Sequence, residues 1–341
     1  MTDTSGLRRR TRTALAATAA AALLATTAGL WATDTWPFRE TYCWGAWQEG
    51  DDGIFFDEEE FAGEQDAERL SEQSPPPTSG RPEGTCEVTV AWRRKDGERR
   101  SASISAAYGR PPAGEADHRA WLDRYLHGTT SALPDGLDGV VAKDRALLVL
   151  PAGCDVGGRP TVVTLSSADA EEAPRILADM LVDLANTAMR TAGCAPGEPL
   201  ARTSPIDGLH RRDFTSPPDR ACGIPGVHFS DSPATSNDQY ASVHGDRYQT
   251  CSVVRTSPRR PAEPVGHYVM VGTPRLVALF EGLPEGPARG LVRRSCDGRP
   301  TLFYGDPQKA AGTGVPDDGA VFARYVESVG KRVGCGDGGE A

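Results

Sequence analysis

The sequence predicts an α+β fold: two tandem related units follow an N-terminal apolar segment, and each is an antiparallel sheet covered by an amphipathic helix and braced by two disulfides. Three observations predict this fold. The string CDVGGRPTVVTL at Cys154 has a shorter relative, CDGRPTLFY, at Cys296. Each string is followed by a run of helical period that ends in Gly-Cys. All eight cysteines lie beyond the apolar segment, and their even number is typical of disulfides in an exported protein.

The chain begins with a basic segment, residues 1–12, and residues 13–33 then carry no charge. This order predicts a transmembrane anchor whose basic end stays in the cytoplasm. The run is rich in Ala and Thr, and cleavage after Ala28 or Ala32 would make it a signal sequence instead. The sequence favours a single-pass protein of the cell membrane with its C-terminal bulk extracellular, and a secreted protein is the alternative.

Aromatic residues lie on both sides of the start of the first unit, which is placed at residues 34–198. Trp31 and Trp36 are expected at the membrane interface, where indole rings are common. Tyr42, Trp44 and Trp47 follow, and we expect them in the first core strand. The chain is thus expected to enter its core directly after the membrane.

An acidic stretch comes next. Eleven carboxylates and one arginine lie between Glu49 and Glu72, and they account for the whole net charge of −10. These charge blocks and the Pro-Pro-Pro after them predict a disordered loop over residues 49–85. A cation-binding or partner-binding segment is the alternative. Its apolar anchors would be Ile54, Phe55, Phe56 and Phe61.

The rest of the first unit is expected to contain a hairpin (86–108), a helix (115–127), a strand (139–150), a strand from Arg159 to about Ser166, and the closing helix. The Pro-rich residues 195–219 are expected to form a linker. The second unit, residues 199–341, is leaner. We expect strands over residues 266–282 and no counterpart of the helix at Trp121.

The two closing helices align without a gap when each is counted back from its Gly-Cys. Every apolar position then coincides, and the spacing traces one buried helix face. The aligned residues are Met180, Leu181, Leu184, Ala185 and Ala188 on Val321, Phe322, Tyr325, Val326 and Val329. A tandem duplication explains this coincidence and the repeated string.

The layout also favours particular disulfides. A strand of ~25 Å followed by an antiparallel helix of ~30 Å returns the chain to its starting point. This favours Cys154 with Cys194 and Cys296 with Cys335, and it leaves Cys43 with Cys86 and Cys222 with Cys251. Eight cysteines allow many pairings, so the sequence alone does not establish these pairs.

The repeated string carries Asp155 and Arg159 in the first unit and Asp297 and Arg299 in the second. The sequence favours a structural role, in which each aspartate holds the arginine in a turn and the following proline fixes the start of a strand. An interaction site is the alternative.

No signature of catalysis is present. GxSxG, HExxH, Walker A and GxGxxG motifs are absent, and the Ser328 to Lys331 SxxK lacks its usual partners. The six histidines show no metal-ligand spacing, and nothing basic and aromatic is arranged for nucleic acid. The sequence therefore predicts no catalytic, cofactor-binding or metal-binding residue, no cofactor and no nucleic-acid partner.

The segment Arg8 to Trp31, the stretch WPFRETYCWGAW and the paired strings resemble exported actinobacterial proteins in which an anchor precedes disulfide-braced α+β domains. No established activity comes with that resemblance. The sequence predicts a non-enzymatic envelope protein, held in the membrane by residues 13–33, which binds a protein or a cell-wall component in a sensor, adaptor or structural role. The alternative is an envelope hydrolase, which requires a concave pocket holding a histidine or carboxylate of shifted pKa.

Overall fold

The computed structural model describes residues 40–53, 55–56, 65–94, 96–127, 130–168, 172–206, 210–212, 221–227, 236–257, 260–305 and 318–336. Over these ranges the fold is α+β, as predicted, and its strands pair antiparallel. The expected anchor at residues 13–33, together with Trp31 and Trp36, lies outside them. Among the helices in the described ranges, none combines the length and apolar character needed to cross a bilayer.

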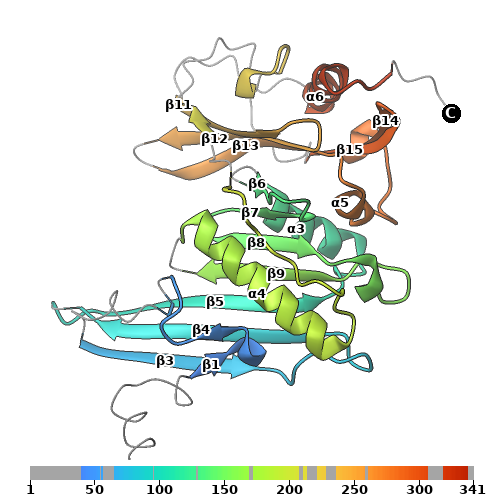
Figure 1. Cartoon of the computed structure of the whole chain (residues 1–341). Helices are drawn as coiled ribbons and strands as arrows, with labels where there is room; N and C mark the ends of the chain where they lie inside the picture. The colour runs from blue at the N-terminus through green and yellow to red at the C-terminus, as the bar shows by residue number, and fades with distance from the viewer. Residues whose placement is uncertain are drawn as a thin grey trace, which may run out of the picture.

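The first sheet, here called sheet 1, has seven strands in the order β3-β4-β5-β9-β8-β7-β6 (Figure 1). Its strands are β3 (Gln65–Gln73), β4 (Gly84–Arg93), β5 (Arg99–Gly109), β6 (Ser131–Ala132), β7 (Gly139–Val141), β8 (Arg145–Val149) and β9 (Val162–Ala168). The strand expected over residues 139–150 is therefore two strands, because the chain turns between β7 and β8. The hairpin β4–β5 forms where Asp96-Gly97 predicts a turn.

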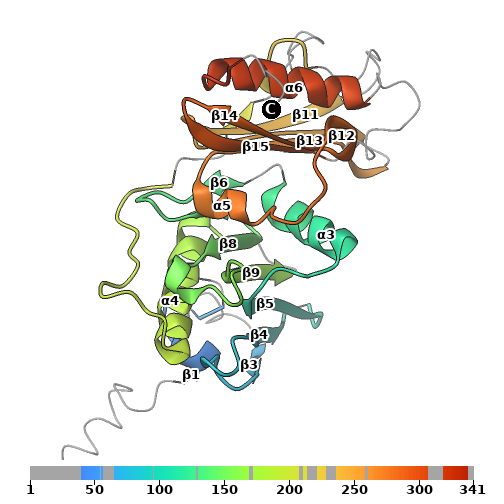
Figure 2. The same cartoon turned by 90° about the vertical axis from the view of Figure 1, so that its right-hand side faces the viewer.

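Helix α4 (Pro174–Ala192) covers one face of sheet 1, and α3 (Glu115–Leu126) lies on the other face (Figure 2). The apolar stripe of α4 is buried against alternate residues of the strands, such as Val88, Ile104 and Leu165. The helix ends at Gly193, whose φ of 75° places it in the left-handed region that favours glycine. The closing helix of the first unit thus forms as its period predicts.

The acidic segment is more ordered than its charge suggests. Residues 65–73 form β3, the edge strand of sheet 1, so the disordered loop expected over residues 49–85 is wrong for this part. Phe55 and Phe56 are fully buried beside Tyr42 and Trp47, and this burial offsets the cost of ordering a charged chain. Ile54, Phe61 and residues 57–64 lie outside the described ranges.

Arg69 links β3 to the earlier part of the acidic segment. Its Nε donates to the Phe55 carbonyl at 2.7 Å, and its Nη1 lies 3.1 Å from Glu49. The aromatic residues before it form two short strands, β1 (Thr41–Tyr42) and β2 (Trp47–Gln48), separated by the 3-10 turn Cys43–Gly45, rather than one core strand. Trp47 is buried, and its indole donates to the Met180 carbonyl of α4 at 3.0 Å.

The second sheet, sheet 2, has six strands in the order β10-β11-β12-β13-β15-β14. They are β10 (His210–Arg212), β11 (Ser236–His244), β12 (Tyr248–Ser257), β13 (Arg260–Val271), β14 (Leu291–Cys296) and β15 (Arg299–Gly305). Helix α6 (Asp318–Arg332) covers its outer face with Phe322, Tyr325 and Val329. The strand expectation for residues 266–282 is wrong after Val271, because Pro274 opens the short helix α5 (Pro274–Ala278).

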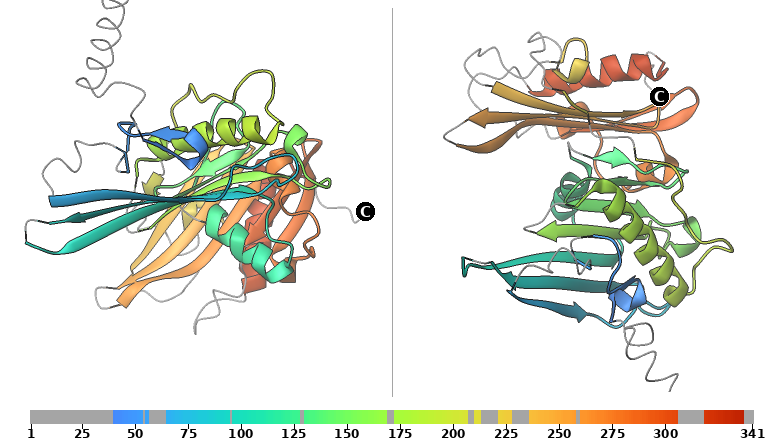
Figure 3. Two further views of the ribbon diagram at one scale, coloured as in Figure 1. Left: turned by 90° about the horizontal axis from the view of Figure 1, so that it is seen from below. Right: turned by 60° about the vertical axis from the view of Figure 1, so that its left-hand side comes forward.

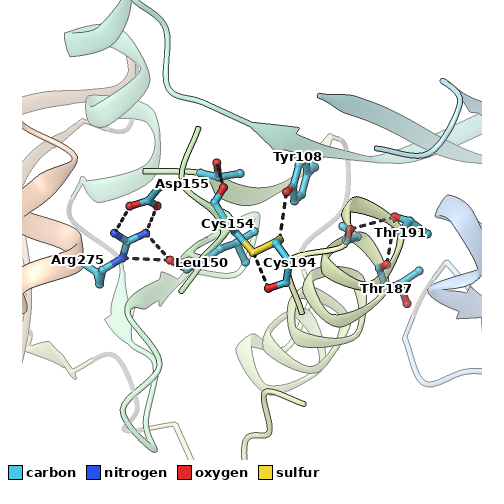
Figure 4. Close-up of a disulfide and its surroundings, with 10 residues drawn as sticks. Tyr108, Leu150, Cys154, Asp155, Thr187, Thr191, Cys194 and Arg275 are labelled. Carbon is cyan, nitrogen blue, oxygen red and sulfur yellow. Dashed lines mark hydrogen bonds and ion pairs between the residues drawn. A yellow bond between two sulfur atoms is a disulfide. The ribbon is translucent and has the colours of Figure 1, made fainter. Parts of the chain in front are cut away.

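Four disulfides join Cys43 to Cys86, Cys154 to Cys194, Cys222 to Cys251 and Cys296 to Cys335. The return of each closing helix favours the second and fourth of these pairs, and the other two are the pairs that this argument leaves. The bond between Cys154 and Cys194 fastens the end of α4 to the turn after β8 (Figure 4). Each bond closes a loop within one sheet and its neighbouring segments.

Sheet 2 lies across the β6 end of sheet 1, with α3 and α5 between them (Figures 1 and 3). One apolar core is shared by both sheets, and we call it the seam. Its members include Leu122, Leu126, Leu147, Val149, Val269, Val271, Leu276, Phe280, Leu302 and Tyr304. The two sheets are therefore joined by a continuous buried contact.

The linker expected over residues 195–219 is wrong for residues 210–212, which form β10 of sheet 2, and residues 195–206 are held against the first unit by hydrogen bonds. Asn186 of α4 bonds both backbone groups of Leu200, at 2.8 and 2.9 Å. Asp135 accepts bonds from the backbone N–H groups of Thr203 and Ser204, and bonds from Ser204 lower the pKa of Asp135 to about 2. Residues 195–206 are therefore fixed to α4 and to the turn at Asp135.

Candidate binding site

The first repeated string contributes an ion pair across the seam. Asp155 accepts a bond from Arg275 Nη1 at 2.8 Å, and Arg275 Nη2 also donates to the Leu150 carbonyl at 2.5 Å (Figure 4). The expected pairing of Asp155 with Arg159 is therefore wrong, since the aspartate is taken by a residue far along the chain. Arg159 closes the turn through backbone bonds with Val156 and lies near His118.

The second string is used differently. Arg299 pairs with Asp246 in the turn between β11 and β12, again not with the aspartate of its own string. The backbone N–H of Asp297 donates to the Gly334 carbonyl at 3.0 Å. Gly334 has a φ of 71°, in the left-handed region that favours glycine, and a Cβ there would lie 2.1 Å from Asp297 Oδ1. The residues of both strings therefore stabilise the fold, but they do so through different partners.

A groove of about 620 Å³ lies on the face of sheet 1 opposite α4. Its lining residues are Glu72, Gln73, Ser74, Thr85, Cys86, Glu87, Ser105, Ala106, Ala107, Arg124, Tyr125, Thr164 and Ser166. The groove exists because α3 lies over β8 and β9 and leaves the polar side of β3, β4 and β5 uncovered (Figure 2). We refer to it as the sheet groove.

One row of paired residues crosses the sheet groove. Glu72 on β3 stands opposite Glu87 on β4, Glu87 opposite Ser105 on β5, and Ser105 opposite Ser166 on β9. One end of this row therefore carries two adjacent carboxylates, and like charges directly opposite one another on neighbouring strands repel. Arg124 of α3 closes the other end, where its Nη2 donates to Ser166 Oγ at 2.7 Å.

The wall that carries Arg124 is fixed by aromatic packing. Tyr125 is 6% exposed, and its ring lies 5.3 Å from that of Trp121. The Arg124 guanidinium lies 5.8 Å from the centre of the Tyr125 ring, within cation–π range. The groove therefore presents charges of opposite sign at its two ends on a rigid support.

Sequence reasoning missed the sheet groove because it depends on strand register. A signal was nevertheless present. Polar residues alternate with apolar ones along both strands of the hairpin, which is typical of a sheet with one uncovered face. These residues are Thr85, Glu87 and Thr89 on β4 and Ser101, Ser103 and Ser105 on β5.

A second cavity, of about 240 Å³, lies between the two sheets. It is lined by Asp138, Arg247, Tyr248 and Thr273 together with the Leu133 to Gly136 turn. Burial raises the pKa of Asp138, while Thr273 and Arg275 act in the opposite direction. The cavity therefore holds a half-buried carboxyl that takes up a proton more readily than one in water.

Carboxylates also gather where the acidic segment meets α4. Asp51, Asp52, Asp179 and Asp183 line a hollow of about 380 Å³ beside Trp47. Burial and the neighbouring charges raise the pKa of Asp183. Over the described ranges, no group of three or more histidine, cysteine or acidic side chains is arranged to hold a metal ion. The alternative of a cation-binding segment gains no metal geometry from these residues.

His118 gives the seam a pH dependence. It is 4% exposed, and burial together with the charge of Arg159 lowers its pKa. The folded protein therefore binds this proton less readily than the unfolded chain, which takes it up first as the pH falls below about 6.5. We expect the free energy of unfolding to decrease below that pH, by at most about 1.4 kcal/mol per pH unit for one proton.

Urea unfolding of residues 34–341 at about pH 7.5 and about pH 5.5 measures this decrease. His118→Gln retains a donor for the Leu279 backbone but cannot take up a proton in this range, so it should lose less stability between the two pH values. Identical losses in the two proteins would contradict the assignment to His118.

Comparisons of the chain with protein-family models, with curated proteins and with solved structures find no match.

Proposed function

We propose that this protein is a non-enzymatic component of the cell envelope, anchored by residues 13–33, which binds a cell-wall component in the sheet groove. The observation that carries the proposal is the groove itself: a polar, charged hollow on a rigid face of sheet 1. The four disulfides indicate an oxidising compartment, as an exterior location requires. The shared seam supports the groove, because it fixes α3 against both sheets.

We also propose that the two sheets arose by duplication, and strand register supports this. In sheet 1, Cys86 pairs with Ala106 and Ala106 with Leu165. In sheet 2, Cys251 pairs with Tyr268 and Tyr268 with Gly305. Aligning the repeated strings at Arg159 and Arg299 places Leu165 on Gly305 as well. A crystal structure in which these strands do not superpose would refute the duplication.

Co-sedimentation of residues 34–341 with insoluble purified cell wall tests the binding role. We expect the wild type to sediment with the wall and Ser105→Trp to lose at least about tenfold in affinity, since an indole would fill the groove. Ser105 is exposed on β5, so the substitution leaves the core intact.

The matched control is Ser295→Trp, an exposed serine on β14 of sheet 2, which should bind as the wild type does. Undiminished sedimentation of a folded Ser105→Trp protein would refute the groove as the binding site. Absence of sedimentation by the wild type would refute the binding function.

One observation favours a second candidate, an envelope hydrolase. That alternative needs a carboxylate of shifted pKa in a pocket shared by both sheets, and Asp138 in the second cavity meets this requirement. The same experiment separates the two functions. A hydrolase would release soluble wall fragments and would lose this release in Asp138→Asn, whereas a binding protein releases none.

A further inference from the structure

The acidic end of the sheet groove is an unneutralised pair. Glu72 and Glu87 are both exposed and face each other across β3 and β4. Within the described part of the chain, neither carboxylate forms an ion pair. Arg69, the nearest arginine along β3, is occupied by Glu49 and the Phe55 carbonyl. A cationic group bound between the two carboxylates would relieve their repulsion.

The basic end is equally specific. Arg124 is held by Ser166 Oγ and by the Tyr125 ring, so its guanidinium has a defined position over β9. Planar guanidinium groups bind carboxylates through two parallel hydrogen bonds. The groove therefore offers an amine site at one end and a carboxylate site at the other.

The separation of the ends sets the length of the ligand. Adjacent strands lie ~4.8 Å apart, so Glu87 and Ser166, two strands from each other, are separated by ~10 Å, and Glu72 lies ~14 Å from Ser166. An extended peptide spans ~3.3 to 3.6 Å per residue, so three or four residues cover this distance. Between the ends, Thr85 and Ser105 offer hydroxyl groups that donate to and accept from peptide amides.

We propose that the sheet groove binds a short linear peptide of three or four residues that has both a free amino group and a free carboxylate. The peptide lies across the strands, with its amine between Glu72 and Glu87 and its carboxylate against Arg124. This inference rests on the proposed function, because it names the part of the wall component that the groove takes.

Titration calorimetry with tetra-alanine tests the inference on residues 34–341. We expect the peptide with free termini to bind, and the N-acetylated and C-amidated forms each to bind at least about tenfold more weakly, as lost ion pairs predict. In Glu87→Gln the preference for a free amine should largely disappear while the preference for a free carboxylate persists. In Arg124→Gln the reverse should hold.

Glu98→Gln is the matched control, because this exposed glutamate pairs with Arg100 in the hairpin turn, outside the groove. It should retain both preferences. Absence of binding by the free peptide, equal binding of the blocked peptides, or unchanged preferences in the two groove variants would overturn the inference. The proposed function is tested separately by co-sedimentation. If the wild type sediments with the cell wall and Ser105→Trp does not, the binding function is supported even when the peptide titration fails.

Discussion

Removal of the Cys154 to Cys194 disulfide, by replacing both cysteines with serine, is expected to lower the free energy of unfolding by about 4 kcal/mol. The bond closes a loop with a sequence separation of 40, so the unfolded chain gains considerable freedom when it is lost. It also fastens the end of α4, whose apolar face fills the core of sheet 1. Urea unfolding of the double variant, monitored by far-ultraviolet circular dichroism, measures the change.

The double substitution leaves no unpaired thiol, so exchange with the other three bonds does not complicate the result. The comparison variant replaces Cys222 and Cys251, whose separation is 29, and should lose slightly less stability. A loss below about 1 kcal/mol on removing Cys154 and Cys194 would contradict a bracing role for this bond.

Arg275→Ala is expected to cost about 3 kcal/mol of unfolding free energy. The guanidinium binds Asp155 and the Leu150 carbonyl across the seam, and the side chains of Arg275 and Asp155 are only 21% and 20% exposed. Truncation leaves a largely buried carboxylate and a carbonyl without this donor, and this penalty exceeds the value of the contact itself. The unfolding free energy of Arg275→Lys should lie between those of the wild type and Arg275→Ala, since an ammonium group cannot form the paired hydrogen bonds of a guanidinium.

The control for this prediction is Arg293→Ala. Its pair with Glu285 is more open, at 32% and 47% side-chain exposure, so its loss should change stability by less than about 0.5 kcal/mol. Equal effects of Arg275→Ala and Arg293→Ala in urea unfolding would show that the seam contact adds nothing beyond an ordinary surface pair.

Local patterns in the sequence predict much of this fold. The helical period of residues 174–192 and the return of that helix to Cys154 depend on nearby residues, and both appear in the structure. The charge of residues 65–73 does not predict that they form an ordered strand. That outcome depends on the burial of Phe55 and Phe56 in a core that other segments build. Burial of apolar rings outweighed the local repulsion of the carboxylates.

Long-range contacts explain the remaining differences. Asp155 and Arg275 are separated by 120 residues, and no local pattern indicates that they meet. The sheet groove depends in the same way on a register that sets Glu72 opposite Glu87 and Glu87 opposite Ser105. The alternation of polar residues along β4 and β5 predicts an open face, but it does not place the two charges at opposite ends of it.

The seam bears on how many groove-like faces each polypeptide can offer. If the strands correspond as the repeated strings align them, Glu87, Ser105 and Thr164 of sheet 1 match Ser252, His267 and Tyr304 of sheet 2. All three residues of sheet 2 are buried, and Tyr304 belongs to the core that joins the sheets. In sheet 2 the corresponding face is therefore covered by the seam, so that, if the sheet groove binds as proposed, each polypeptide offers one such surface, on sheet 1.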